Sequence, residues 1–254
     1  MLVLILAILQ ARVSSTRLPG KVLKPILGVP MILRQIERVK RANYIDKLIV
    51  ATSTDASDNN LFEICQQHGI ECLRGSLNDV LDRFYQVAIQ YNPEHVVRLT
   101  GDCPLADPEI IDEVIQKHLT GEYDYTSNTV EPTYPDGLDV EIFRLSCLER
   151  AWKEASLPSQ REHVTLFFHQ HSELFNIGSM KNTVNLSKLR WTVDELEDFE
   201  LVNKIYEQLY PNNNSFSTCE ILNYLNSNEV VKNINSHFNR NEGLKKSLQQ
   251  ESIK

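Results

Sequence analysis

A basic, hydroxyl-rich segment near the start of the chain has the residue types that bind a polyphosphate. It spans residues 10–21 and carries Arg12, Arg17 and Lys21 beside three hydroxyl side chains and a Pro-Gly turn. Hydroxyl and backbone N–H groups donate short hydrogen bonds to phosphate oxygens, and the three cations neutralise phosphate charge. The residue types therefore predict a phosphate site, with an ordinary solvated loop as the alternative.

Two common explanations of this region do not fit the sequence. The phosphate-binding loop of kinases and ATPases requires glycine where Ser15 stands and a hydroxyl where Val22 stands. The apolar run before the segment, residues 2–9, has no basic residues before it and no small-residue cleavage site after it. We therefore expect a buried strand there and no secretory signal. The run is also shorter than the ~20 residues that span a bilayer, so we expect no contact with a membrane.

Two aspartates follow strand-like segments further along the chain. Asp102 follows residues 95–99, and Asp194 follows residues 188–193. Magnesium prefers carboxylate and phosphate oxygens, so carboxylates beside a phosphate-binding segment suit magnesium-assisted nucleotidyl transfer. Each aspartate alone could instead cap the turn or helix that follows it.

The composition limits the classes of protein that fit. The 254 residues allow one large α/β domain or two small ones, and 42% hydrophobic residues can form a sizeable core. The formal net charge of -8 argues against general nucleic-acid binding, although a local basic cluster can still bind a nucleotide. The five cysteines show no CxxC pair and no zinc-ligand spacing. We expect reduced thiols in a cytoplasmic protein.

Strand-like and helix-like segments alternate through the first half of the chain. We expect strands at residues 2–9, 47–52, 70–73 and 95–99. Helices are expected from about residue 30, over residues 57–68, from residue 78 or 79, and from residue 107. This order predicts a mostly parallel sheet with helices on both faces. Ligands bind at the carboxyl ends of such strands, where residues 10–21, 52–55, 74–75 and 100–102 would meet.

The second half has a different character. We expect strands at residues 140–143, 176–180 and 188–193, and helices at residues 147–155, 160–171 and 195–210. Residues 212–215 read as a flexible hinge, residues 219–225 as a short amphipathic segment, and the polar tail as poorly packed chain or a frayed helix. We therefore divide the chain into a catalytic domain, residues 1–210, and a polar C-terminal extension, residues 211–254.

Taken together, these motifs resemble those of the cytidylyltransferases that make CMP-activated acidic sugars, the CMP-sialate and CMP-KDO synthetases. The resemblance rests on residues 10–21 followed by Leu23, on Gly101 to Leu105, and on Val193-Asp194 with Glu197-Asp198. Residues 135–141 and 161–165 resemble most the branch named after the spore-coat polysaccharide protein SpsF. The resemblance covers residues 1 to about 210 and implies a three-layer αβα nucleotidyltransferase fold of the Rossmann-like, GT-A type.

The resemblance also implies roles for individual residues. The catalytic set would be Arg12 and Lys21 on the CTP triphosphate, with Asp102 and Asp194 as ligands of Mg²⁺. The nucleotide-binding set would be Ala11, Arg12, Ser14, Ser15, Arg17, Lys21, Thr52, Ser53, Arg74 and Thr100. The acceptor sugar would contact Asp139, Glu141, Arg161 and His163. For these last four, solvent-facing or internally satisfied side chains are the alternative.

Two positions depart from the pattern of the family. Some CMP-sialate synthetases have an aspartate where Thr192 stands, so the site is closer to the KDO type with one late carboxylate. KDO enzymes often have glutamine where Thr100 stands. The identity of the acceptor sugar is therefore not carried over.

The implied reaction is attack by a sugar hydroxyl on the α-phosphorus of CTP with release of pyrophosphate, for cell-surface or spore-coat polysaccharide synthesis. Related enzymes are often homodimers, and residues 134–171 are a candidate interface or substrate-closing region. Three alternatives stay open. A glycosyltransferase would usually carry an Asp-x-Asp pair, which the sequence lacks, and another sugar nucleotidyltransferase would carry a glycine-rich loop. A non-catalytic nucleotide-binding scaffold is the third.

Overall fold

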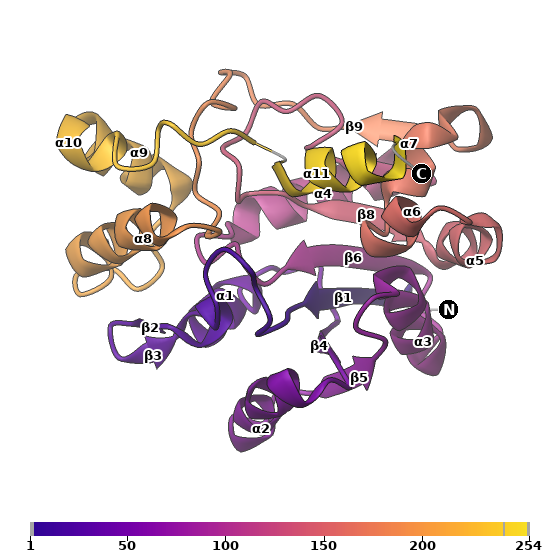
Figure 1. The fold of residues 1–254 in the computed structure, drawn as a ribbon. Coiled ribbons are helices and arrows are strands. Elements are labelled where there is room, and N and C mark those ends of the chain that lie inside the picture. The colour runs from indigo at the N-terminus through magenta and orange to yellow at the C-terminus, as the bar shows by residue number, and fades with distance from the viewer. Residues whose placement is uncertain (1–2, 241, 253–254) are drawn as a thin grey trace.

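The computed structural model describes residues 3–240 and 242–252, and its centre is a seven-stranded sheet (Figure 1). In spatial order the strands are β5 (Cys72–Gly75), β4 (Lys47–Ser53), β1 (Ile5–Gln10), β6 (His95–Thr100), β8 (Glu141–Arg144), β7 (Tyr125–Ser127) and β9 (Ile177–Ser179). Strands β1, β4, β5 and β6 are parallel, and β8 is antiparallel to both of its neighbours. The expected mostly parallel α/β sheet is thus confirmed.

Helices cover both faces of the sheet and make a three-layer structure (Figure 1). One core contains side chains of α1 (Met31–Val39), α2 (Asn59–Gln67), α4 (Pro108–Thr120), α8 (Leu196–Leu209) and α9 (Thr218–Asn226). The other contains side chains of α3 (Val80–Tyr91), α5 (Leu145–Glu154) and α7 (Leu166–Gln170). Strand β1 contributes to both cores, because Ala7 and Leu9 belong to the first core while Leu6 and Ile8 belong to the second. This alternation is the two-residue period of a strand buried on both faces.

Local signals in the sequence set the starts of the helices in the first half. The Asp79 side chain accepts a hydrogen bond from the backbone N–H of Asp82 and begins α3. Asp107 caps α4 in the same way, with Pro108 at the first helical position. A short 3₁₀ helix, η2 (Ala56–Asp58), leads into α2. These elements lie within a few residues of their expected positions.

Two expectations for the second half are wrong. Residues 188–193 form no strand, because Trp191 and Thr192 donate their N–H groups to the carbonyl of Asp136 in a turn. Only Arg190 makes an isolated bridge, to that same aspartate. The single helix expected over residues 160–171 is two helices, α6 (Pro158–Glu162) and α7, because Val164 between them has a left-handed φ of 49°.

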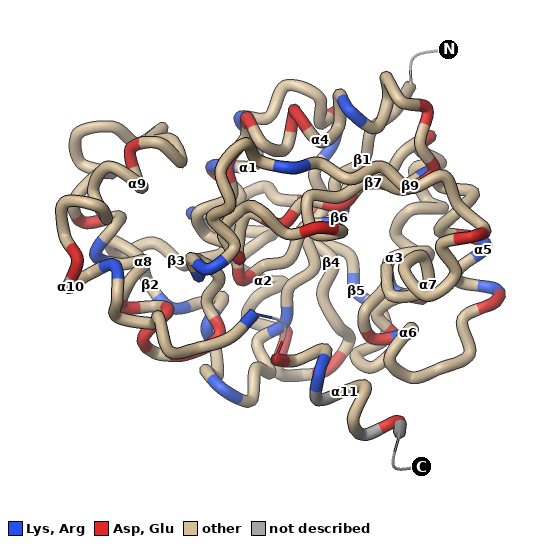
Figure 2. Tube along the Cα trace, turned by 90° about the horizontal axis from the view of Figure 1, so that it is seen from above, with Lys and Arg blue, Asp and Glu red and all other residues tan. Residues whose placement is uncertain are grey.

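The segment after α8 packs onto the domain. The turn over residues 212–215 leads to Phe216, which is buried in the same core as Ile221 and Leu225 of α9. Helix α10 (Glu229–Lys232) follows, and the polar tail forms α11 (Glu242–Ser252), the helical alternative. Both views place α11 beside α6 (Figures 1 and 2). The domain boundary at residue 210 stays a prediction.

The remaining elements are small. A hairpin joins β2 (Pro25–Ile26) to β3 (Val29–Pro30), and the 3₁₀ helices η1 (Lys21–Leu23) and η3 (Ser172–Leu174) lie in loops. Lysine, arginine and acidic residues are interspersed along the whole trace (Figure 2). No helix within the described residues is long and apolar enough to cross a membrane.

Candidate active site

Three residues from distant parts of the sequence meet at the carboxyl edge of the sheet. The Lys21 Nζ atom lies 3.1 Å from Oδ2 of Asp102 and 2.7 Å from Oδ1 of Asp194. It also donates to the carbonyl of Val193 at 2.8 Å. The lysine and both aspartates of the expected catalytic set therefore form one cluster. Its placement beside β1 and β6 agrees with the expected position of a ligand site in a parallel sheet.

The charges in this cluster stabilise one another. Burial alone would raise the pKa of Asp102, but the Lys21 ammonium lowers it to about 2. Burial would likewise lower the pKa of Lys21, but Asp102 and Asp194 raise it above its usual value. At neutral pH the cluster therefore holds the Lys21 ammonium and an ionised Asp102.

Two glycines bring the backbone into position. Gly20 has a φ of 71°, in the left-handed region, and precedes the short helix η1 that presents Lys21. Gly101 donates its N–H to the carbonyl of Gln10, so β6 stays close to β1 just before Asp102. A Cβ atom at Gly101 would lie 2.8 Å from the Cβ of Ala11, too close for any side chain.

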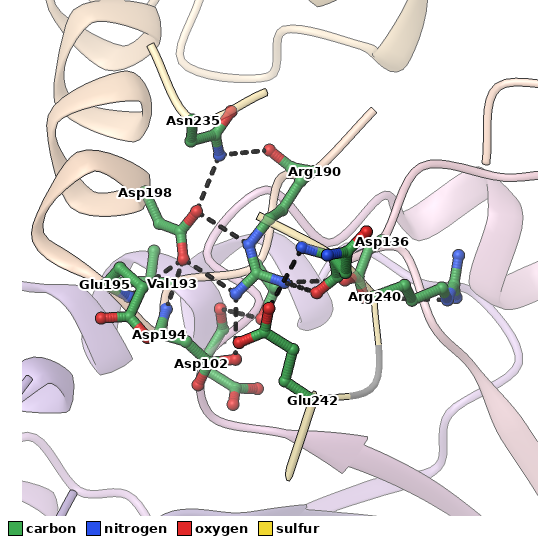
Figure 3. Close-up of polar contacts among 12 residues, drawn as sticks. Asp102, Asp136, Arg190, Val193, Asp194, Glu195, Asp198, Asn235, Arg240 and Glu242 are labelled. Carbon is green, nitrogen blue, oxygen red and sulfur yellow. Dashed lines mark hydrogen bonds and ion pairs between the residues drawn. The ribbon is translucent and has the colours of Figure 1, made fainter. Parts of the chain in front are cut away.

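A buried network holds Asp194 in place (Figure 3). The Asp198 carboxylate is fully buried and accepts from the backbone N–H groups of Asp194 and Glu195 at 2.9 and 3.0 Å. Arg190 donates to both oxygens of Asp198 and, through Nη2, to Asp194 at 3.2 Å. Asn235 donates to Asp198 at 2.7 Å and to the Arg190 carbonyl at 2.9 Å. Because every partner is itself bonded, this network fixes the direction of the Asp194 carboxylate.

The segment after β1 is held at its first turn and exposed beyond it. Buried Asp58 accepts from the N–H of Val13 at 2.6 Å. Arg12 and Ser14 are exposed and Ser15 is half-buried. Arg17 lies 2.9 Å from Oδ2 of Asp194, so the basic segment folds back onto the carboxylate cluster. Within the described chain no ion pair to Arg12 is found, which leaves its guanidinium free for an anionic ligand.

The residues expected near the nucleoside lie at the ends of β4 and β5. Thr52 and Ser53 are fully buried, main chain included, and the Ser53 hydroxyl donates to Asp58, so neither residue is exposed to a ligand in this structure. Arg74 donates to the carbonyls of Ser53 and Asp55 at 2.8 and 2.9 Å. Its guanidinium therefore shapes this turn.

Two further residues of the nucleotide set lie where β1 and β6 end. Ala11 is buried, and its methyl group lies against Gly101. Thr100 is half-buried, with its carbonyl bonded by Gln35 at 2.7 Å. For all ten residues of this set, contact with a nucleotide stays a prediction.

Carboxylates gather beside β8, on the other side of Asp102. Glu141 accepts from the Tyr125 hydroxyl at 2.6 Å and pairs with Arg98. Burial would raise the pKa of Glu141, but Arg98 and the Tyr125 hydroxyl lower it. Burial and the neighbouring Asp139 raise the pKa of Asp136 to about 7, against the opposing effect of two arginines. Burial also raises the pKa of Asp139.

The other two residues expected on the sugar side are bonded to other partners. Arg161 donates to Asp79 from Nε and Nη2, at 2.6 to 3.0 Å, and to the Trp152 carbonyl at 2.7 Å. It thereby ties α6 to the start of α3. His163 lies 3.0 Å from the Ser247 hydroxyl of α11. Their roles toward a sugar stay predictions.

Several residues of the site were not expected from the sequence. Asp136 and Asp198 lie within the segments that resemble the family motifs, so the sequence itself could have indicated them. No signal in the sequence indicated Arg190, Asn235 or Arg240, because they lie in irregular segments without a repeat or motif. Their roles come from contacts between residues 8 to 101 positions apart.

The donor set fits a magnesium ion. Among the described residues there is no group of three or more His, Cys, Asp and Glu residues that could hold a metal alone. One oxygen of Asp102 and one of Asp194 nevertheless lie within 3.1 Å of a single cation, the Lys21 ammonium. A site that supplies two carboxylates and takes its other ligands from water and substrate phosphates is the kind that Mg²⁺ occupies.

Comparison with known proteins gives one consistent result. The profile of a family described as cytidylyltransferase matches residues 6–241. Spore coat polysaccharide biosynthesis protein SpsF of Bacillus subtilis is 34% identical over 231 residues, 88% of this chain and 95% of that protein. The 3-deoxy-manno-octulosonate cytidylyltransferase of Geobacter metallireducens is 36% identical over 113 residues, 44% of this chain and 43% of that protein. A solved cytidylyltransferase of Leptospira borgpetersenii has a TM-score of 0.85 at 32% identity, covering 90% of this chain and 96% of that one.

Proposed function

The chain belongs to the cytidylyltransferase family, a family of nucleotidyltransferases, and we propose that it transfers CMP from CTP to an acidic sugar with Mg²⁺ as cofactor. The observation that carries the proposal is the cluster of Lys21, Asp102 and Asp194 beside the exposed Arg12. It supplies carboxylates for a metal and cations for a triphosphate at one edge of the sheet. The acidic class of the acceptor is supported by the relative from Geobacter metallireducens, whose name specifies 3-deoxy-manno-octulosonate.

The order of the strands suggests how the two substrates would be arranged. Strands β5, β4 and β1 lie on one side of β6, and β8 lies on the other. We assign the nucleoside to the turns after β4 and β5, and the triphosphate to Arg12 and Lys21 after β1. Asp102, after β6, then lies between the triphosphate and the acceptor. Asp139, before the start of β8, and Glu141, its first residue, face the acceptor side.

The reaction exchanges one P–O bond for another and releases the hydroxyl proton. The sugar hydroxyl oxygen attacks the α-phosphorus, the bond from that phosphorus to the bridging oxygen of the β-phosphate breaks, and pyrophosphate leaves. The hydroxyl proton passes to solvent or to the Asp136–Asp139 pair, whose pKa values are raised. Arg12 and Lys21 stabilise the charge that builds on pyrophosphate. Positioning and charge stabilisation suffice, and no covalent enzyme intermediate is needed.

Asp102 and Asp194 would hold the magnesium ion. When bound, Mg²⁺ neutralises phosphate charge and polarises the α-phosphate. The Lys21 ammonium that now contacts both carboxylates is then free to bind phosphate oxygens, a task for which lysine is well suited. We also propose a homodimer and a role in surface-polysaccharide synthesis, on the family resemblance alone.

The experiment that tests the proposal is release of pyrophosphate by the purified protein. CTP, UTP, ATP and GTP are each combined with Mg²⁺ and with nonulosonic acids, KDO or sugar phosphates, and EDTA is the control for the metal. Release that requires CTP, Mg²⁺ and one acidic sugar supports the proposal. Release with a sugar phosphate would contradict the acceptor class, and release in EDTA would contradict the metal. Nucleotide binding without turnover with any acceptor would favour a scaffold.

A further inference from the structure

The C-terminal segment places an arginine on the acceptor side of the site. The Arg240 Nη2 atom lies 2.5 Å from Oδ1 of Asp139, and Nη1 lies 3.2 Å from the carbonyl of Tyr134. Its Nε atom lies 3.9 Å from Oδ1 of Asp136. The side chain is 14% exposed, so water screens this guanidinium only partly. Arg240 is thus built into the site from outside residues 1–210, where the family motifs lie (Figure 3).

We propose that Arg240 binds the carboxylate of the acceptor sugar, an inference that rests on the proposed function. Asp139 lies just before β8, on the side of Asp102 opposite the nucleotide loops. A cation held there is placed for the acceptor and not for the triphosphate. A guanidinium is also the side chain that recognises a carboxylate best, through two parallel N–H donors.

Charge balance gives a second reason. The acceptor side carries Asp136 and Asp139 close to Asp102, and these carboxylates would repel an acidic sugar. Arg190 nearby is already engaged, since its N–H groups donate to Asp136, Asp194, Asp198 and the Asn239 carbonyl. Arg240 has five N–H groups, of which two make hydrogen bonds within the described chain. It can therefore donate to the carboxylate of a sugar without losing its present partners.

The rest of the segment holds Arg240 over the site. Before it, Asn235 is buried against Asp198 and Arg190, and the carbonyl of Asn239 accepts from Arg190 at 3.1 Å. After it, Glu242 lies 3.7 Å from Arg17, and Ser247 and Glu251 of α11 contact α6. The chain is thus anchored on both sides of Arg240. This explains how a residue in an irregular segment can serve as a fixed binding group.

The test compares two enzymes on two acceptors. Wild type and Arg240→Ala are assayed for pyrophosphate release with the acidic sugar that wild type uses and with the same sugar whose carboxyl is reduced to the alcohol. Arg240→Ala should raise KM for the acidic sugar about 10- to 100-fold, as expected for loss of a charge-assisted pair. Its KM for the reduced sugar and for CTP should not change. Arg240→Lys should restore part of the loss, and Arg150→Ala, on the outer side of α5, is the matched control.

The outcomes separate this inference from the proposed function. If wild type uses the acidic sugar and Arg240→Ala uses it with the same KM, only the role of Arg240 is refuted. The same holds if the variant loses affinity for both sugars equally, because the effect is then structural. If wild type prefers the reduced sugar, or turns over no sugar, the acidic acceptor and the role of Arg240 are refuted together. Melting temperatures of all variants show whether each one is folded.

Discussion

The Nζ atom of Lys21 lies 2.7 Å from the carboxylate of Asp194, although 173 positions separate the two residues in the sequence. Asp102 completes the cluster from the end of β6. The ammonium therefore lies where a metal ion would lie, between two carboxylates that would repel each other without it. This relationship makes Lys21 both a stabilising residue and a group that competes with a metal for its ligands.

Replacement of this lysine separates the two roles. Lys21→Met keeps the length of the side chain but removes the charge. We expect a loss of about 2 kcal/mol in the free energy of unfolding, less than for a fully buried pair because both carboxylates are partly exposed. Pyrophosphate release should fall at least ~100-fold. In the absence of nucleotide, MgCl₂ should raise the melting temperature of the variant more than that of wild type. An equal response to MgCl₂ would argue against a metal held by these carboxylates, and Lys24→Met serves as control.

Loss of the carboxylate on β6 should abolish turnover while the protein stays folded. Asp102→Ala removes one proposed ligand of Mg²⁺, and its backbone carbonyl, which accepts from Val193 and Thr192, is kept. We expect pyrophosphate release to fall by ~100-fold or more. The melting temperature should fall modestly, because the Lys21 ammonium loses one of its two carboxylate partners but keeps Asp194. Glu113→Gln, an exposed carboxyl on α4, is the control. Normal product formation by folded Asp102→Ala would refute the metal assignment.

The buried amide of Asn235 should be essential for stability because its partner is a buried carboxylate. Asn235→Asp keeps the shape of the side chain but places a second carboxylate against Asp198. We expect it to destabilise the protein more than Asn235→Ala, which should cost about 1–3 kcal/mol for the hydrogen bonds that are lost. Urea denaturation followed by circular dichroism measures both, with exposed Asn233→Ala as reference. Equal stability of the two variants would mean that Asn235 is not coupled to the charge of Asp198.

Two glycines allow backbone strain to be separated from crowding. Both Gly28 and Gly137 have positive φ angles, 74° and 109°. A Cβ atom at Gly28 would meet nothing within 4 Å, whereas one at Gly137 would lie 2.4 Å from the backbone nitrogen of Thr192. Gly28→Ala should therefore cost only the strain of the left-handed conformation, about 1–2 kcal/mol. Gly137→Ala should cost several times as much or prevent folding, and similar midpoints for both would contradict this account.

Comparison of the expected and observed elements shows which physical signals are local. Asp79 and Asp107 cap helices through hydrogen bonds to residues two or three positions away, so their effect can be inferred from the sequence. Residues 188–193 have the apolar character of a strand, since Trp191 and Val193 are buried. Trp191 instead donates its N–H to the carbonyl of Asp136, more than 50 positions earlier, and Val193 donates to that of Asp102. Burial can be inferred from composition, but the bonding partner cannot.

The same distinction applies to the site. Lys21, Asp102 and Asp194 could be inferred because each lies in a motif of its own, and the sheet brings these motifs to one edge. Arg190 and Arg240 could not, because a guanidinium becomes part of a site only through partners that the fold supplies. For Arg240 the partner is Asp139, 101 positions earlier in the chain.

A buried pair of histidines should make the fold sensitive to acid. His118 is fully buried, with its ring nitrogens 3.0 Å from the Thr126 hydroxyl and 3.0 Å from Nδ1 of His95. Burial, reinforced by His95 and Arg144, lowers the pKa of His118 to about 3. A histidine with a lower pKa in the folded chain than in the unfolded chain binds fewer protons when folded. The contribution of His118 to the free energy of unfolding is therefore complete above its unfolded pKa of about 6.5. It is lost as the pH falls from there toward 3.

The expected loss between pH 7.5 and pH 5 is on the order of 2 kcal/mol from this residue alone. Urea midpoints at the two pH values measure it in wild type and in His118→Gln, whose amide cannot be protonated. The variant is less stable at both pH values if the amide packs poorly, so the quantity to compare is the difference between them. That difference should be smaller in His118→Gln. The unfolded wild-type chain takes up a proton on His118 at low pH, whereas the glutamine of the variant takes up none. An unchanged difference would place the acid sensitivity elsewhere, with the nearby His95, whose pKa burial also lowers, as the next residue to replace.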